Sequence, residues 1–120
     1  MLERAPAAHP DCTPDPEHLI VGDILETLPA FTRRFGPGCA ALIHADIGTG
    51  DDDGNRRLAA QLSPLLAPLL APGGLMLADR SFDLAGCEDI AALTGVEQGR
   101  YFVFRRRESA CRPAGQVSAR

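Results

Sequence analysis

The sequence predicts an α/β fold with a mostly parallel sheet and an antiparallel hairpin at its C-terminal end. Short apolar runs alternate with helical patterns along the chain, which is typical of strands connected by helices. The run 39–45 is apolar on both faces, as a parallel strand covered by helices on both sides requires. We assign residues 1–107 to a single domain and expect the polar, aperiodic residues 108–120 to form a disordered tail.

The first third of the chain predicts a loop, a strand and a helix. Residues 5–17 contain four prolines, which exclude them from a helix interior or a central strand. A short strand is predicted at 19–21 and ends at Gly22-Asp23. Residues 28–35 then have a helical pattern, with Pro29 in the first turn and a glycine as the stop signal.

After the strand 39–45, an acidic loop and a leucine-rich helix are expected. The loop 49–54 lacks the glutamate that a calcium loop needs at its twelfth position, so we interpret it as a cap for a helix starting near Asn55. Ser63-Pro64 resembles an N-cap followed by a first-turn proline, which predicts a kink or restart. Five leucines at helical spacing form one apolar face: Leu58, Leu62, Leu65, Leu66 and Leu69.

The remaining elements complete the sheet. Residues 71–74, Ala-Pro-Gly-Gly, break the helix and lead to a buried strand at 75–78, which ends at Asp79. A short helix is expected at 88–93. The last strand is expected at 101–104, preceded by a tight turn from a short partner strand near Val96.

Composition excludes several classes of function. The formal net charge is −4, and the arginine cluster 105–107 is interpreted as a solvated strand end, so no nucleic-acid partner is predicted. The four cysteines form no C-x-x-C pair, so neither a zinc site nor a redox pair is indicated. No secretory signal and no apolar run of about 18 residues is present, which predicts a soluble, cytoplasmic protein without membrane contact.

Aspartates follow three of the predicted strands, where open α/β sheets bind their ligands. Taken singly, Asp23, Asp46 and Asp79 are each explained more readily as a helix cap or an Asx turn. The three together favour a ligand crevice. His44 lies two residues before Asp46 and should point to the same side of the strand, which makes it a candidate general base. The alternative for His44 is a hydrogen-bonded core histidine.

Three segments resemble motifs of the class I S-adenosylmethionine-dependent methyltransferases. Residues 21–29 are similar to the third-strand motif, residues 42–46 to the fourth, and residues 70–76, Leu-Ala-Pro-Gly-Gly-Leu-Met, to the approach to the fifth. Residues 101–105 are placed like the seventh strand. The resemblance covers residues 2–106 and is closest to a small bacterial group of S-adenosylmethionine methyltransferases. It implies a partial Rossmann-like methyltransferase fold, the strand order 3-2-1-4-5-7-6, and S-adenosyl-L-methionine as cofactor.

The resemblance also implies roles for single residues. Glu3 would end the second strand and bind the ribose hydroxyls, and Asp23 with Ile24 would lie near the adenine. Asp46 would face both cofactor and acceptor, so Asp46 and His44 are the catalytic candidates. Related metal-dependent enzymes end the fifth strand in Asp-Asn. Here Arg80 replaces the asparagine, so no metal is predicted.

The family's first strand and its G-x-G-x-G turn have no counterpart in this sequence. We therefore expect a truncated chain, a gene that begins upstream of Met1, and methyl transfer to an unidentified small molecule that is impaired or absent. An open sheet edge would also allow a homo-oligomer to form. The alternative is a non-catalytic α/β interaction module or decayed gene product. A dinucleotide-binding domain is disfavoured because no G-x-G-x-x-G is present.

Overall fold

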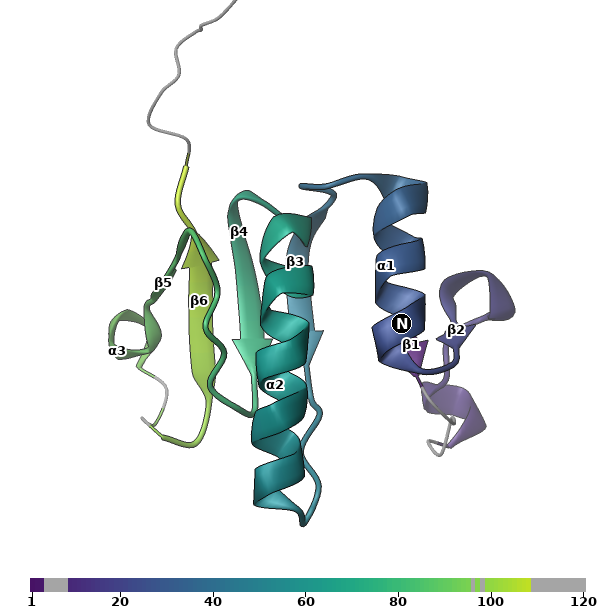
Figure 1. Cartoon of the computed structure of the whole chain (residues 1–120), viewed down its shortest axis with the longest axis horizontal. Coiled ribbons are helices and arrows are strands. Elements are labelled where there is room, and N and C mark those ends of the chain that lie inside the picture. The colour runs from purple at the N-terminus through teal and green to yellow at the C-terminus, as the bar shows by residue number, and fades with distance from the viewer. Residues whose placement is uncertain (4–8, 96, 98, 109–120) are drawn as a thin grey trace, which may run out of the picture. The chain divides into compact units, whose positions relative to one another are not determined.

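The computed structural model describes residues 1–3, 9–95, 97 and 99–108. The chain forms two compact units, Met1–Pro37 and Gly38–Arg120. Both units contain strands and helices, and each unit contains a parallel strand pair (Figure 1). The expected α/β fold class is confirmed.

The first unit is built on a two-stranded parallel sheet. Strand β1 (Leu2–Glu3) pairs with β2 (Ile20–Val21), with Leu2 opposite Ile20 and Glu3 opposite Val21. Between them lie two single-turn 3₁₀ helices, Pro10–Cys12 and Pro16–His18, each of which begins with a proline. A loop was predicted for residues 5–17, and the strand predicted at 19–21 is confirmed as β2, which begins one residue later. The 3₁₀ turns fit the loop because a proline has no N–H to donate in a first turn.

Helix α1 (Ile24–Phe35) begins four residues before the predicted start. The Asp23 Oδ1 accepts a hydrogen bond from the backbone N–H of Leu25 at 2.9 Å, so Asp23 is the N-cap. Pro29 consequently lies inside the helix, and its predicted place in the first turn is wrong. The predicted stop is confirmed: Gly36 has φ of 87°, a left-handed conformation that favours glycine.

The second unit contains a four-stranded sheet in the order β3-β4-β6-β5 (Figure 1). Strand β3 is parallel to β4, whereas β6 is antiparallel to both of its neighbours. The strands predicted at 39–45, 75–78 and 101–104 are therefore confirmed, with shifted ends. Their bounds are β3 (Ala40–Ala45), β4 (Leu70–Ala78), β5 (Cys87–Asp89) and β6 (Phe102–Arg106).

Strand β4 is longer than predicted because residues 71–74 belong to it. The pairing jumps from Ala40 opposite Leu70 to Leu42 opposite Leu75, so five steps along β4 match two along β3. The Ala-Pro-Gly-Gly segment is thus an irregularity within the strand. Gly74 is buried there, and a Cβ on it would lie 2.8 Å from the Ala71 carbonyl oxygen.

Helix α2 (Asp52–Leu66) starts three residues before Asn55 and is capped by the acidic loop as expected. The cap is Asp51, whose Oδ1 accepts from the backbone N–H of Gly54 at 3.0 Å. The predicted restart at Ser63-Pro64 is wrong, since the helix continues to Leu66. The Ser63 hydroxyl donates to the Ala59 carbonyl at 2.7 Å and accepts from the Asp83 backbone N–H at 3.2 Å, so it fastens a later loop instead of capping a helix.

The predicted leucine face of α2 is confirmed and forms the core of the second unit. Helix α2 lies across one face of the sheet (Figure 1). Leu62 is 1% exposed, and Leu70 of β4, which follows the 3₁₀ turn Ala67–Leu69, is 0% exposed. The other buried apolar residues in this core include Leu66, Leu69, Met76, Ala78, Val103 and Phe104.

The helix predicted at 88–93 is wrong in its first half. Residues Cys87–Asp89 form β5, and only Ala91–Thr94 is helical, as α3. Glu88 lies opposite Arg105 on β6, and the Arg105 Nη2 donates to the Glu88 Oε1 at 2.7 Å. This hydrogen bond holds the pKa of the Glu88 carboxyl below its usual value. The Glu88–Arg105 pair across the two strands favours a strand at Glu88, where the local sequence pattern indicated a helix.

The interpretation of the arginine cluster as a solvated strand end fits the exposed Arg105 and Arg107, but it is incomplete for the half-buried Arg106. Arg105 bonds Glu88, and the Arg106 Nη1 donates to the carbonyl oxygens of Leu70 and Pro68. Arg106 thereby satisfies carbonyls around the end of the 3₁₀ turn. The partner strand expected near Val96, its turn residue Gln98, and the tail from residue 109 onward lie outside the described residues.

Within the described part of the chain, no helix combines the length and apolarity needed to cross a membrane. The longest helix, α2, has 15 residues.

Leu62→Ala should destabilise the second unit, because it removes a side chain that is 1% exposed. Truncation of a buried leucine costs about 2–5 kcal/mol in the free energy of unfolding. The matched control is Leu93→Ala, since Leu93 is 79% exposed and its loss should change stability by no more than about 0.5 kcal/mol. Urea unfolding followed by circular dichroism measures both. Equal losses for the two variants would contradict the packing described above.

Candidate functional site

Two acidic residues lie at the carboxyl edge of the β1–β2 pair. Glu3 is the last residue of β1, and its carbonyl oxygen accepts from the backbone N–H of Gly22 at 3.0 Å. Asp23 follows directly, so the backbone brings Glu3 and Asp23 to one edge. Glu3 is half-buried, and Asp23 is exposed. The structure therefore brings to one edge the two acidic residues that the family resemblance assigns to the nucleoside.

Asp23 also has the structural role that was weighed as its alternative. Its Oδ1 is engaged by the Leu25 N–H, and its carbonyl oxygen accepts from the N–H groups of Glu26 and Thr27. Ile24 is half-buried and opens helix α1. The Thr27 Oγ1 is buried and has no hydrogen-bond partner among the described residues. The first turn of α1 thus combines a partly engaged carboxylate, an apolar side chain and an unsatisfied hydroxyl.

A second edge lies in the Gly38–Arg120 unit, where the parallel strands β3 and β4 end together. Ala45 is opposite Ala78, so Asp46 and Asp79 follow the two strands at the same level. The Asp79 carboxylate accepts from the backbone N–H of Ile47 at 3.2 Å through Oδ1, and from that of Gly48 at 2.7 Å through Oδ2. Asp79 caps no helix. It fixes the start of the loop that follows Asp46.

Gly48 is required for this contact. A Cβ at position 48 would lie 2.3 Å from the Asp79 Oδ2, closer than real Cβ atoms approach an oxygen. Only a residue without a side chain lets the backbone N–H reach the carboxylate in this way.

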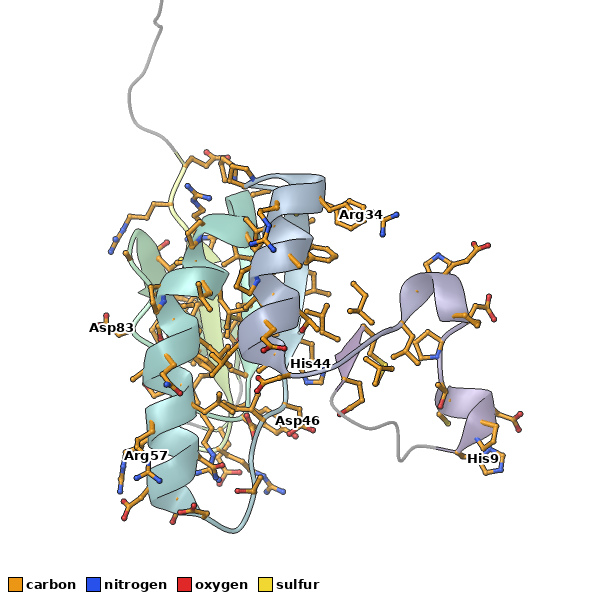
Figure 2. All side chains as sticks on the ribbon, turned by 45° about the vertical axis from the view of Figure 1, so that its right-hand side comes forward. His9, Arg34, His44, Asp46, Arg57 and Asp83 are labelled. Carbon is orange, nitrogen blue, oxygen red and sulfur yellow. The ribbon has the colours of Figure 1, made fainter. Side chains whose placement is uncertain are left out.

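The predicted catalytic pair, His44 and Asp46, lies at the end of β3, and both side chains are exposed (Figure 2). The alternative of a hydrogen-bonded core histidine is therefore wrong for His44. No hydrogen bond or ion pair joins His44 to Asp46, both of which the structure describes. Each is open to a ligand that approaches from solvent, and their roles in proton transfer stay predictions.

The sequence interpretation missed Asn55, which organises the loop from the other side. Asn55 is 3% exposed. Its Nδ2 donates to the Thr49 carbonyl at 2.9 Å, while its Oδ1 accepts from the Thr49 N–H at 3.2 Å and from the Thr49 hydroxyl at 2.9 Å. The signal was a polar residue at helical spacing from the leucine face of α2. With Asp79, Asn55 fixes the loop after Asp46 at two points.

Arg80 stands next to Asp79 and makes one ion pair. Its Nη1 lies 3.3 Å from the Asp52 Oδ1, and the Asp52 side chain is 75% exposed, so water screens the pair. The Arg80 Nε is buried without a hydrogen-bond partner in the described residues. Those residues contain no group of three His, Cys, Asp or Glu side chains arranged to hold a metal ion.

Cys87 on β5 is the remaining nucleophilic side chain with a shifted pKa. Burial raises the pKa of its thiol, although Arg106 and Arg107 act in the opposite direction. A raised pKa keeps the sulfur protonated near neutral pH, and the protonated thiol is a poor nucleophile. Cys87 therefore has no indicated catalytic role.

The topology defines the class of protein. With β1 and β2 as second and third strands, the first sheet has the order 3-2, and β3-β4-β6-β5 has the order 4-5-7-6. These are the two parts of the strand order implied by the methyltransferase resemblance. An acidic residue also follows the parallel strands at the carboxyl edges. Fold and edges together define a partial Rossmann-like domain of the methyltransferase class.

Comparison with known proteins identifies the family. Residues 1–106 match the family described as S-adenosyl-L-methionine methyltransferase, and the chain belongs to this family. It is also similar to the crystal structure of an S-adenosyl-L-methionine methyl transferase from Silicibacter pomeroyi DSS-3, with 46% sequence identity and a TM-score of 0.81. That similarity covers 88% of this chain but 64% of the other. No curated protein matches the chain. The resemblance and the Rossmann-like fold are confirmed.

Asp79→Ala should loosen the loop after Asp46, because it removes the acceptor of two backbone hydrogen bonds. Bonds of this kind to a charged group contribute about 1.5–3 kcal/mol when buried and less at an exposed site. Hydrogen exchange at the Ile47 and Gly48 amides, measured by NMR, should accelerate at least about fivefold. Asp83→Ala removes an exposed carboxylate elsewhere and should leave both amides unchanged. Unchanged exchange in Asp79→Ala would show that the carboxylate does not fix the loop.

Proposed function

We propose that this chain takes part in S-adenosylmethionine-dependent methyl transfer to a small-molecule acceptor in the cytoplasm. The observation that carries the proposal is the pair of acids, Glu3 and Asp23, at the carboxyl edge of a parallel strand pair. Ligands of open α/β sheets bind outside this edge. The family to which the chain belongs supplies the identity of the cofactor.

The residues of the first unit fit the nucleoside half of that cofactor. Carboxylates accept hydrogen bonds from ribose hydroxyls and from an exocyclic amine, and Glu3 and Asp23 are of this type. Ile24 offers an apolar side chain for the adenine ring. The unsatisfied Thr27 Oγ1 is a further hydrogen-bonding group in the same turn. Glu3 and Asp23 address only the nucleoside end of the cofactor, which supports weak binding by these residues alone.

When bound, the cofactor supplies an electrophilic methyl group on a positively charged sulfur. In the proposed function, Asp46 positions the acceptor and the fixed loop after it limits the conformations available to that carboxylate. His44 or Asp46 accepts a proton where the acceptor must lose one. Positioning of this kind contributes much of the acceleration in a displacement reaction.

Two exposed leucines favour a second candidate function, a non-catalytic interaction module. Leu42 on β3 is 60% exposed and Leu77 on β4 is 37% exposed. His44 is opposite Leu77, so both leucines and His44 lie on the same face of the sheet. An apolar face of this kind is typical of surfaces that another protein covers. Cofactor binding separates the two candidates.

The chain should bind S-adenosylmethionine more weakly than a dissociation constant of about 10 μM, roughly −7 kcal/mol. An NMR titration into the millimolar range should shift the backbone signals of Glu3, Gly22 and Ile24. Asp23→Asn keeps the helix cap, because asparagine also accepts at Oδ1, yet removes the charge. It should weaken binding about threefold to tenfold, since a hydrogen bond to a charged group is stronger than one to an amide.

Asp15→Asn is the matched control, because Asp15 is exposed in the same unit and its side chain caps nothing. It should leave the affinity unchanged. Calorimetry that gives a dissociation constant below about 10 μM would contradict the expected weak binding. A titration without any shift would favour the interaction module.

Asp46→Ala should lower methyl turnover or cofactor affinity at least tenfold, about 1.4 kcal/mol, in a form of the protein that transfers methyl groups. The expected cause is the loss of the exposed carboxylate at the end of β3. Asp53→Ala, which removes an exposed carboxylate in the first turn of α2, is the control and should keep the rate. Single-turnover kinetics separates binding from chemistry. An unchanged rate in Asp46→Ala would leave Asp46 with no role in the reaction.

A further inference from the structure

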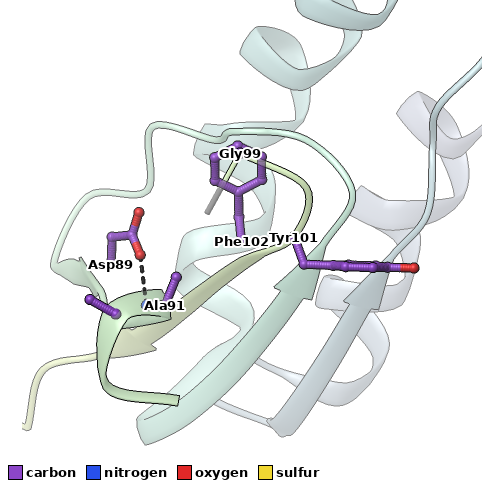
Figure 3. Close-up of a pocket in the computed structure, with 6 residues that line it drawn as sticks. Asp89, Ala91, Gly99, Tyr101 and Phe102 are labelled. Atoms are coloured by element: carbon purple, nitrogen blue, oxygen red, sulfur yellow. Dashed lines mark hydrogen bonds between the residues drawn. The ribbon is translucent and has the colours of Figure 1, made fainter. Parts of the chain in front are cut away.

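A hollow of about 370 Å³ lies beside helix α3 in the second unit (Figure 3). Sites for small molecules range from roughly 300 to 1,000 Å³, so the hollow is large enough for one. None of the residues proposed for methyl transfer lines it. Its lining consists of Asp89, Ala91, Ala92, Gly99, Tyr101 and Phe102.

The hollow opens at the edge of the sheet where ligands of α/β proteins bind. Phe102, the first residue of β6, is opposite Ala78, the last residue of β4. Asp89 is the last residue of β5, and β5 runs parallel to β4 because both are antiparallel to β6. The hollow therefore lies at the carboxyl edge of β4 and β5, the edge that also carries Asp46 and Asp79.

The lining combines apolar groups with one charge. Phe102 offers an aromatic ring, and Ala91 and Ala92 offer methyl groups. Asp89 is the charged residue of the lining. Its Oδ1 accepts from the Ala91 N–H at 2.9 Å, which leaves Oδ2 without a partner among the described residues. Figure 3 shows the Tyr101 ring pointing away from Asp89, so the carboxylate and the Phe102 ring are the main recognition groups.

The charge of the surroundings selects among ligands. Arg100, which lies between the lining residues Gly99 and Tyr101, is ion-paired with Glu97, with 3.6 Å between Nη1 and Oε2. Arg105 is paired with Glu88. The Asp89 carboxylate thus faces the hollow without a basic side chain beside it in the lining. A ligand anion would be repelled there, whereas an ammonium group would gain a charge-assisted hydrogen bond.

We propose that this hollow binds a small amine with an apolar or aromatic body. The ammonium group donates to the Asp89 Oδ2, and the apolar body lies against the Phe102 ring and the alanine methyl groups. The proposal goes beyond methyl transfer and does not depend on it, because it concerns binding by residues that have no assigned role in that reaction.

The test uses 2-phenylethylamine as the probe and the full chain labelled with ¹⁵N. The amine should shift the amide signals of Ala91, Ala92 and Gly99 in a saturable way, whereas phenylacetate, with the opposite charge, should not. Asp89→Asn keeps the acceptor for the Ala91 N–H and removes the charge. It should weaken binding of the amine at least threefold and abolish its dependence on salt, because an exposed ion pair is screened by added ions.

Two matched pairs of variants make the result specific. Asp83→Asn makes the same charge change at an exposed site outside the hollow and should bind the amine like the unmodified chain. Ala92→Phe fills the hollow and should block binding, whereas Leu93→Phe adds bulk at a neighbouring residue that is 79% exposed and does not line it. Circular dichroism verifies that each variant is folded.

Each possible outcome either supports or overturns the proposed amine site. Saturable shifts that depend on Asp89 and disappear in Ala92→Phe support the site. Absence of shifts at millimolar amine, equal binding of amine and phenylacetate, or full binding by Asp89→Asn would each overturn it. Because the readout is amine binding alone, none of these outcomes depends on whether the chain binds S-adenosylmethionine.

Discussion

The two hydrogen bonds that the Asp79 carboxylate accepts from Ile47 and Gly48 connect the ends of the parallel strands β3 and β4. The candidate catalytic edge depends on them, because the Asp46 side chain is exposed and makes no hydrogen bond or ion pair with the residues that the structure describes. The loop is fixed by its neighbours instead: by Asp79 at its start and by the buried Asn55 at Thr49. A site on a loop can have a well-defined geometry when buried or charged groups on helices and strands make the hydrogen bonds that hold the loop.

Helix capping and ligand binding are compatible in such a fold. Asp23 gives one oxygen to the Leu25 N–H, and Asp89 gives one to the Ala91 N–H. In each case this hydrogen bond orients the carboxylate, and the second oxygen can meet a ligand. Asp23 is the N-cap of α1, whereas Asp89 precedes Ile90, the N-cap of α3. A capping interaction therefore does not argue against a binding role. It supplies the rigidity that an exposed aspartate side chain otherwise lacks.

The sequence predicted those features that depend on local pattern. The apolar runs of β3 and β4, the glycine stop at Gly36 and the leucine face of α2 follow from periodicity and backbone preference. It failed where a distant partner decided the outcome. Ser63 was predicted to cap a helix, but its hydroxyl bonds Ala59 and the distant Asp83 while the helix continues through Pro64, and Glu88 lies in a strand opposite Arg105, with which it pairs. Asp23 and Asp46 could be singled out from strand-end positions, and Glu3 from the family resemblance, whereas Asn55 and the hollow beside α3 needed the tertiary structure.

Acidic residues at the carboxyl edges suit a cofactor with a positive sulfur, but the same attraction can slow methyl transfer if a carboxylate lies too close to that sulfur. S-adenosylmethionine carries a positive sulfur, and its thioether product is neutral at that atom, so nearby carboxylates favour binding of the cofactor over its product. A carboxylate buried against the sulfur would stabilise the bound cofactor more than the transition state, in which positive charge moves toward the acceptor, and would slow the reaction. In the proposed function Asp46 acts from an exposed position, where water screens the charge of its carboxylate. A carboxylate on the acceptor side does not slow the reaction in this way, because its attraction for the positive charge grows as that charge moves toward the acceptor.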